Sequence, residues 1–569
     1  MRITQISLTN FRSFRATQNI DIAPVTLLFG PNSVGKSSIL LALFYVQQIL
    51  KHGHCDPLRI DALGNKHVGG FRSLVNGRDP KKRITIKIIY KKGDYIGSSY
   101  NKLSELFDDE LGLTVDSPTA DANKVAVELS IAWSYSKGEG YAYVASYKIW
   151  LDDEKIAELS SDAGTKQPMI DYLNYRHPAL VCEEDSDYET EDSFPDYVSN
   201  FQRVINAPRK MMSIVPDVES LKNKDIEFHE PIGFKGFAGA LPKLGSVLET
   251  TLNIDPPVMT QRVHEILSDV VVAPLDNLLL LLNESLCIGP LRVVPDSLSS
   301  RNPYPNQRDW YDGTAAWEEL RNSGSQVMEL NHWMNKPDTL NLGYSVRNKS
   351  TRQVINYSGS ENWTGEMLDM LRGILSREVG RESSEKLKES VNDLPEGLRA
   401  EIRKELEKDE SNILDKSRFD IVLWDDVNGI EINSSEVGVG VSQLLPLVVA
   451  AVKRPHGLIA CEQPELHVHP RVQVGIGDLL LQTSRGSKTF LIETHSEHLI
   501  LRILKRIRQT TDGELPENID PVSPEHVSIT YLEPGPSGVI SRRIEIDKEG
   551  EFVQRWPHGF FTERGEELF

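Results

Sequence analysis

Apolar runs of strand length occur near both ends of the chain. Residues 25–29 (VTLLF) are a continuous run of strand-forming side chains, and residues 38–50 follow as an uninterrupted helical stretch. Residues 457–461 and 489–492 are two further apolar runs, each followed by polar residues. Short apolar runs with such boundaries are typical of buried strands. The pattern therefore predicts an α/β core whose central strands come from both ends of the chain.

Other segments alternate between apolar and polar residues. Residues 2–9 and 83–90 alternate as half-buried strands do, and residues 125–131 and 141–151 are interpreted as further strands. Residues 286–292 are expected to be a strand that returns to the core.

Five parts of the chain follow from these patterns. The middle of the chain shows weaker periodicity, and one later stretch has helical composition with charge on most faces. We expect an N-terminal part of the core at 1–151, a large insertion of unknown role at 152–283, a return to the core at 284–362, a projecting helical arm at 363–415, and a C-terminal part of the core at 416–569.

Composition and charge limit the environment of the protein. The chain has 569 residues and a net charge of −20, so it offers no general attraction to nucleic acid, and any DNA contact would need a local basic patch. No apolar run approaches the roughly 20 residues needed to cross a bilayer, and the chain opens on a strand pattern without a signal-peptide core. We therefore expect a cytoplasmic protein without a membrane partner.

One segment carries a complete phosphate-binding motif. Residues 30–37 (GPNSVGKS) match G-x-x-x-x-G-K-[ST], and they stand between the strand at 25–29 and the helix at 38–50, as the motif requires. The glycines let backbone N–H groups face a triphosphate, Lys36 can reach the β and γ phosphates, and the Ser37 hydroxyl can ligate Mg²⁺. ATP or GTP would bind here. The expected nucleotide-binding residues are Asn32, Ser33, Val34, Gly35, Lys36, Ser37 and Ser38.

A carboxylate for the cation is expected much later in the chain. The apolar run at 457–461 ends in Glu462, which would hold the water shell of Mg²⁺, so the predicted metal residues are Ser37 and Glu462. Gln463 follows, at the position where a general base is normally found. An amide orients water but cannot take its proton, which predicts slow hydrolysis unless Glu465 or a partner residue is the base.

Two more segments complete the expected site. Residues 438–443 (GVGVSQ) precede a helical stretch, so Gly440 and Ser442 are candidates for a second anion cradle, with an ordinary N-capped glycine loop as the alternative. The run at 489–492 leads to His495, which can hydrogen-bond a γ phosphate, although it can also be a plain histidine at a strand end. The helical stretch after it carries four basic residues that face either DNA or solvent.

Together these motifs resemble the ABC-type ATPases of the SMC, RecF and OLD-like group. Residues 10–14 (NFRSF) resemble the opening strand motif of that group, 30–37 its Walker A motif, 438–443 its signature loop, 458–465 its Walker B motif, and 494–496 its switch histidine. The resemblance implies an ABC/SMC-like P-loop ATPase head with a mixed sheet, with ATP and Mg²⁺ as ligands. It also implies a dimer of heads, or a higher oligomer, in which the signature loop of one subunit closes over the ATP of the other.

The detailed motifs resemble a narrower branch. The run EQPELHVHP at 462–470 and the ending WPHGFF at 556–561 resemble bacterial predicted ATPases that include phage-defence proteins such as the Septu ATPase subunit. OLD-like nucleases carry a Toprim domain after the ATPase, and no D-x-D strand of that kind follows His495. The resemblance then implies a regulatory ATPase that acts with a separately encoded effector, an HNH-type nuclease.

Two other functions stay open at this point. The first is an SMC- or RecF-like ATPase that binds DNA directly in repair. The second is a nuclease contained within residues 152–283.

Overall fold

The structure is a computed structural model of the whole chain. It describes residues 1–93, 98–102, 113–115, 117–136, 139–163, 167–182, 199–206, 231–293, 304–322, 327–351, 418–432, 438–454 and 456–557. The expected arm at 363–415 and the end of the WPHGFF motif lie outside these residues. The chain divides into two compact units, Met1–Tyr344 with Ser434–Phe569, and Ser345–Asn433.

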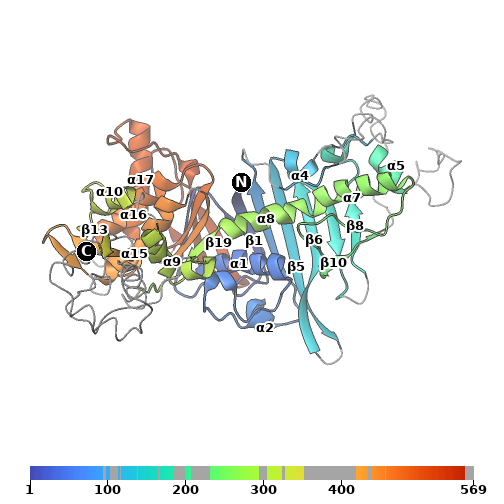
Figure 1. Cartoon of the computed structure of the whole chain (residues 1–569), viewed down its shortest axis with the longest axis horizontal. Coiled ribbons are helices and arrows are strands. Elements are labelled where there is room, and N and C mark those ends of the chain that lie inside the picture. The colour runs from blue at the N-terminus through green and yellow to red at the C-terminus, as the bar shows by residue number, and fades with distance from the viewer. Residues whose placement is uncertain are drawn as a thin grey trace, which may run out of the picture. The chain divides into compact units, whose positions relative to one another are not determined.

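The core of the larger unit is a six-stranded mixed sheet that is assembled from both ends of the chain (Figure 1). Its first five strands are parallel and the last is antiparallel. In spatial order, the strands are β12 (Leu286–Ile288), β16 (Gly457–Glu462), β17 (Lys488–Glu493), β3 (Val25–Phe29), β18 (Val527–Gly535) and β19 (Gly538–Ile544). Every residue of β3, β16 and β17 is buried, which explains their uninterrupted apolar sequences. The predicted α/β class and mixed sheet are confirmed.

An eight-stranded antiparallel sheet forms the second layer of strands in this unit. In spatial order, the strands are β2 (Gln18–Asp21), β1 (Arg2–Thr9), β4 (Ile84–Lys91), β5 (Lys124–Ser136), β6 (Glu139–Leu151), β7 (Glu154–Ser160), β8 (Met169–Leu173) and β9 (Ile232–Gly233). Strands β7, β8 and β9 belong to the expected insertion at 152–283. The described part of that insertion therefore continues the sheet that the N-terminal strands begin.

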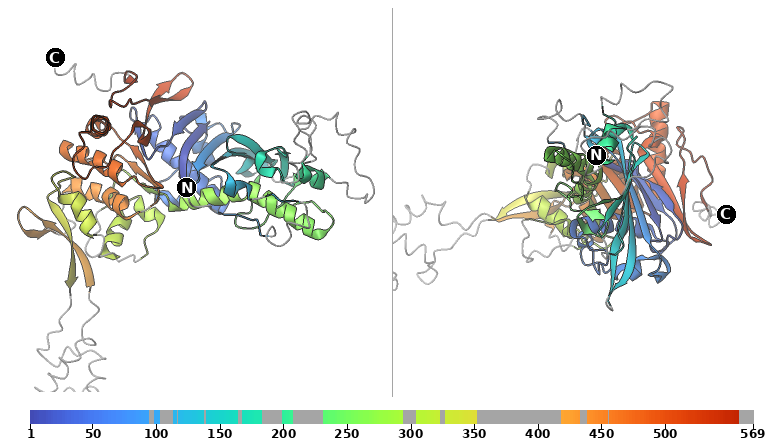
Figure 2. Two further views of the ribbon diagram at one scale, coloured as in Figure 1. Left: turned by 90° about the horizontal axis from the view of Figure 1, so that it is seen from above. Right: turned by 90° about the vertical axis from the view of Figure 1, so that its right-hand side faces the viewer.

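Two helices of the insertion cover one face of the antiparallel sheet, α7 (Pro257–Val271) and α8 (Ala273–Glu284) (Figures 1 and 2). Tyrosine hydroxyls on the sheet fix them in place. Tyr147 Oη donates to the carbonyl of Val271 at 3.0 Å, and Tyr90 Oη donates to the carbonyl of Pro274 at 2.9 Å. These bonds anchor the junction between the two helices on the sheet.

Four helices of this unit carry or follow the expected site motifs. They are α1 (Lys36–His52), α15 (Val439–Lys453), α16 (Pro470–Thr483) and α17 (Glu497–Asp512). Two further helices, α9 (Thr314–Asn322) and α10 (Val327–Asn335), pack against α15. Shorter elements of this unit are α2 (Gly70–Leu74), α4 (Pro118–Asp121), α5 (Asn200–Asn206), β10 (Gly236–Ala238), β11 (Leu241–Pro242) and the 3₁₀ turns Asp61–Leu63, Asn76–Arg78, Pro178–Leu180, Gln307–Trp310 and Pro524–His526. Within the described residues, no helix has the length and apolar character that a membrane span requires.

The smaller unit is described through one three-stranded sheet. Its strands are β13 (Tyr344–Thr351), β14 (Arg418–Asp425) and β15 (Ile430–Ile432). The Arg347 guanidinium lies 4.0 Å from the ring centroid of Trp424, and Ser345 Oγ donates to Asp426 at 2.8 Å. These contacts join β13 to β14 and to the turn that follows it.

Candidate nucleotide-binding site

The phosphate loop connects β3 to α1 and depends on its two glycines. Gly30 has φ 138°, and a Cβ there would lie 2.2 Å from the carbonyl oxygen of Leu532. Gly35 has φ 124°, and its Cβ would lie 2.4 Å from Ser13 Oγ. Any larger residue would therefore clash with the backbone of β18 or with the loop after β1.

The N-terminus of α1 opens onto this loop without a cap. The helix begins at Lys36, and no side chain accepts from its first backbone N–H groups. Such uncapped N–H groups, together with the helix dipole, favour an anion at this end. Ser33 has φ 62°, a left-handed conformation that turns the loop around the same space. The loop residues therefore fit a bound phosphate group.

The Lys36 ammonium lies inside the loop. Its side chain is 2% exposed, and Nζ donates to the carbonyls of Gly30 and Pro31, both at 2.9 Å. Burial lowers the pKa of Lys36, and the charges of Glu493 and Glu465 partly oppose this shift. The ammonium is thus positioned at the centre of the expected phosphate site.

Glu493, the last residue of β17, contacts both functional side chains of the loop. Its Oε2 accepts a hydrogen bond from Ser37 Oγ at 2.6 Å, and its Oε1 lies 3.8 Å from Lys36 Nζ. Burial raises the pKa of Glu493, and the neighbouring charge of Glu462 adds to this effect, whereas the hydrogen bond from Ser37 opposes it. An acidic group therefore adjoins the residue expected to bind Mg²⁺.

Glu462 ends β16, as predicted for the Walker B position, and it is held by two partners. Lys66 Nζ donates to Glu462 Oε1 at 2.9 Å, and Tyr311 Oη donates to the same oxygen at 3.2 Å. Burial alone would lower the pKa of Lys66, but the charge of Glu462 and the contacts with Tyr311 raise it overall. Lys66 is therefore a firmly protonated partner of the carboxylate.

Arg292 connects the Walker B strand to the signature helix. Its guanidinium donates to the carbonyl of Glu462 at 2.7 Å and to the carbonyl of Gln443 at 2.6 Å. The backbone of Arg292 exchanges two further hydrogen bonds with the amide side chain of Gln443. One buried side chain thus joins the start of α15 to the end of β16.

Three of the predicted catalytic residues lie in the turns after β16 and β17. Gln463 has φ 46°, and its N–H donates to the carbonyl of Glu493 at 2.8 Å. Glu465 Oε1 accepts from the N–H of His495 at 2.6 Å. Glu465 Oε2 and His495 Nε2 are both buried and have no hydrogen-bond partner in the described part of the chain. Such buried polar atoms are uncommon, and they favour a ligand at this position.

Burial also determines the protonation of this pair. It raises the pKa of Glu465, whereas the N–H donated by His495 opposes the shift. It lowers the pKa of His495, and the charge of Lys36 adds to that effect. At neutral pH, His495 is therefore a neutral imidazole close enough to Lys36 to experience its charge.

The signature loop packs against the turn that follows the Walker B strand. A Cβ at Gly440 would lie 2.7 Å from the carbonyl oxygen of His467, so glycine is required for this close approach. Ser442 is 3% exposed, and its hydroxyl donates to the carbonyl of Val439 at 2.9 Å. Val439, at the first turn of α15, is 57% exposed. The described hydrogen bonds of Ser442 stay within its own helix, so its assignment to a phosphate stays a prediction.

Three residues of this cluster were not selected from the sequence: Glu493, Lys66 and Arg292. For Glu493, a signal was present, because an acidic residue ends a buried strand two positions before the switch histidine. Lys66 and Arg292 lie in loops without a motif, and only the fold brings them to β16.

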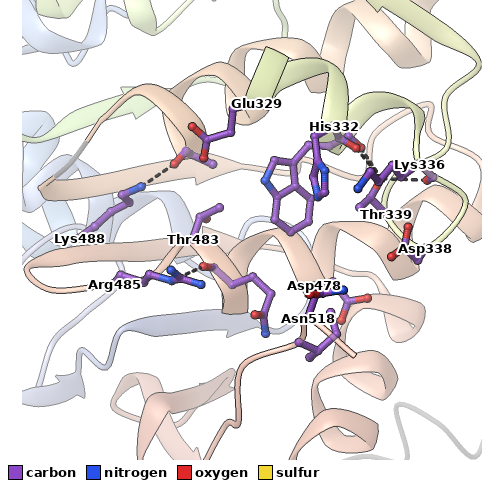
Figure 3. A pocket seen from close by; sticks show the side chains of 14 residues that line it. Glu329, His332, Lys336, Asp338, Thr339, Asp478, Thr483, Arg485, Lys488 and Asn518 are labelled. Atoms are coloured by element: carbon purple, nitrogen blue, oxygen red, sulfur yellow. Dashed lines mark hydrogen bonds between the residues drawn. The ribbon is translucent and has the colours of Figure 1, made fainter. Parts of the chain in front are cut away.

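A separate cavity of about 590 Å³ lies in the same unit, beside α10, α16 and the turn before β17 (Figure 3). Two of its charged lining residues, Asp478 and Lys488, already have partners. Asp478 accepts two hydrogen bonds from Arg506, at 2.7 and 2.9 Å, and Lys488 Nζ donates to the carbonyl of Ala451. The cavity is formed by residues other than those of the phosphate loop.

The loop, the uncapped helix and the carboxylates at the ends of β16 and β17 define a P-loop nucleoside triphosphatase site. The sequence matches the family described as AAA ATPase domain over residues 1–217 and 306–500. Because this match covers well over half of the chain, the protein belongs to the AAA ATPase domain family. The larger unit has the fold of a P-loop ATPase head.

Solved SMC head domains show a distant likeness. An SMC head bound to the C-terminal winged-helix domain of ScpA has 10% identity and a TM-score of 0.34, and the match covers 96% of this chain and 99% of that one. The SMC head domain from Thermotoga maritima has 8% identity, a TM-score of 0.34 and coverages of 96% and 100%. That from Pyrococcus yayanosii has 10% identity, a TM-score of 0.35 and full coverage of both chains. A comparison with curated protein sequences found no match.

Proposed function

We propose that the protein is a cytoplasmic, dimeric ATPase that binds ATP with Mg²⁺, hydrolyses it slowly, and controls a separately encoded nuclease of HNH type in bacterial anti-phage defence. The observation that supports the ATPase most directly is the convergence of Lys36, Ser37, Glu462 and His495 at the carboxyl ends of three neighbouring parallel strands. The defence role is supported by the resemblance of the EQPELHVHP and WPHGFF runs to the Septu-like branch.

The site residues divide the work of hydrolysis. Lys36 and the N-terminus of α1 bind the phosphates. Ser37 would hold Mg²⁺ and Glu462 would hold its water shell, and the cation would neutralise charge that develops on the phosphates. Gln463 orients the attacking water. Glu465, with one buried and unpartnered oxygen, accepts its proton, and His495 senses the γ phosphate. Because Gln463 replaces a carboxylate, turnover should be slow.

The direct DNA-binding alternative is less well supported by α17. Of its four basic residues, Arg506 is buried against Asp478, and Arg502 Nη1 lies 3.2 Å from the same carboxylate. Lys505 and Arg508 are the exposed pair. Two cations on a protein of net charge −20 are a weak DNA footprint.

Dimerisation provides the first test of the proposed function. Ser442→Arg should abolish ATP-induced dimers, because the signature helix would then carry a long cation at the expected subunit interface. Since Ser442 is buried, Val439→Arg supplies a second variant at an exposed position of the same turn, and Ser442→Ala is the control for folding. Sedimentation velocity with a non-hydrolysable ATP analogue measures the result. A strictly monomeric wild-type protein at micromolar concentration, or full dimerisation of both arginine variants, would contradict the dimer.

A deletion of the expected arm tests the proposed binding of a partner protein. We predict that deletion of residues 363–415 removes a co-purifying neighbouring gene product and leaves ATP binding unchanged. Pull-down and a nucleotide-binding assay on the same preparation measure the two properties separately. Metal-dependent DNA cleavage by the purified single chain, abolished by a mutation within 152–283, would instead show that the chain is itself a nuclease.

A further inference from the structure

Glu493 occupies the position in the fold where the two halves of the site meet. Its strand, β17, lies between β16 and β3, and in register Glu493 is paired with Glu462 on one side and with Leu28 on the other. The residue is 6% exposed. An acidic side chain buried at the carboxyl edge of a parallel sheet carries a desolvation cost, which a cationic partner or ligand offsets.

The contacts of Glu493 are with the loop residues that face the nucleotide. Oε2 lies 2.6 Å from Ser37 Oγ, and Oε1 lies 3.8 Å from Lys36 Nζ. Mg²⁺ holds oxygen ligands at 2.0–2.1 Å in octahedral geometry, so neighbouring ligand oxygens are about 2.9 Å apart. The Ser37 and Glu493 oxygens are already close to that separation. A cation can bind both without a movement of β17 or of the first turn of α1.

Glu462, the residue expected at the cation from the motif, is differently placed. Its Oε1 is shared by Lys66 and Tyr311, and its backbone carbonyl accepts from Arg292. A divalent cation in direct contact with Glu462 would have to approach the Lys66 ammonium. This arrangement suits a carboxylate that bonds to the water shell of the cation and not to the cation itself.

We propose that Glu493 is a direct ligand of the divalent cation that accompanies ATP, adjacent to Ser37, with Glu462 in the outer shell. This inference rests on the proposed ATPase function. It has a consequence for binding, because without a cation the Glu493 carboxylate repels the triphosphate. Binding of the cation to Glu493 therefore raises the affinity of the site for ATP.

Glu493→Gln tests the proposal, since the amide keeps the size of the side chain and its oxygen still accepts from Ser37. With Mn²⁺ as the probe and a non-hydrolysable ATP analogue bound, electron paramagnetic resonance measures the free and bound cation. We expect Mn²⁺ affinity to fall at least tenfold. Nucleotide affinity in EDTA should be unchanged or higher, because a negative charge is removed. Glu514→Gln, an exposed position just beyond α17, is the matched control.

The outcomes distinguish a Glu493 that binds the cation from a Glu493 that only holds the phosphate loop in place. Loss of Mn²⁺ affinity with nucleotide binding retained in EDTA supports the proposal. Mn²⁺ affinity within twofold of the wild type overturns it, and so does a joint loss of cation and EDTA-resistant nucleotide binding, which would show that Glu493 only holds the loop. If the wild-type protein binds no ATP at all, the proposed function itself fails, and that result is distinct from the other three.

Discussion

Lys36→Ala should abolish measurable ATP binding. The ammonium is the one cation inside the phosphate loop among the described contacts, and hydrogen bonds between charged groups contribute about 1.5–3 kcal/mol each. Loss of two such bonds to phosphate, about 3–6 kcal/mol together, weakens affinity by more than about a hundredfold, at 1.4 kcal/mol per factor of ten. Titration with a fluorescent ATP analogue measures the change.

The control for this variant must separate binding from folding. In the described state, Lys36 also holds the carbonyls of Gly30 and Pro31, so its removal could loosen the loop. Lys51→Ala, at an exposed position near the end of the same helix, should bind ATP normally. The melting temperatures of both variants, compared with that of the wild type, show whether a loss of ATP binding is a loss of folding. Unchanged ATP affinity in Lys36→Ala would remove the basis for the site.

The sequence was sufficient for those parts of the site that are local in the chain. The phosphate loop and the ends of β16 and β17 are each set by a few consecutive residues, so motif and periodicity locate them. The pairings Lys66 with Glu462 and Ser37 with Glu493 join residues 396 and 456 positions apart. No local pattern encodes such a pairing. It follows from the strand order, which places β17 between β3 and β16.

The expected boundary at 151/152 shows why the structure of the middle of the chain is harder to predict from the sequence. Asp152 and Asp153 have φ 46° and 73°, and they connect β6 to β7, where Leu151 pairs with Glu154. Both positions of this two-residue turn need positive φ, which Asp tolerates. The boundary is expected at this position because the periodicity of the sequence weakens after it. The described strands β7, β8 and β9 nevertheless continue the antiparallel sheet beyond the turn.

The second large effect, on the rate of ATP hydrolysis, is expected at Gln463, the position where a general base is normally found. Gln463→Glu should raise the hydrolysis rate at least tenfold, because a positioned general base contributes about 10²–10⁴ to the rate and the amide contributes none by proton transfer. The backbone bond from Gln463 N–H to Glu493 fixes this turn, so the new carboxylate should take the place of the amide. ATP affinity should be unchanged. Steady-state phosphate release and a binding titration measure the two quantities.

We expect Glu465 to be the general base in the wild-type protein. Its pKa is raised by burial, so it is protonated more readily than an ordinary carboxylate, and the wild-type rate should fall as the solution becomes moderately acidic. Glu465→Gln should reduce the rate about a hundredfold in the wild-type background. In the Gln463→Glu background, the same change should have little effect, because the base has moved. A wild-type turnover already near the typical enzyme value of about 10 per second would show that another residue takes the proton.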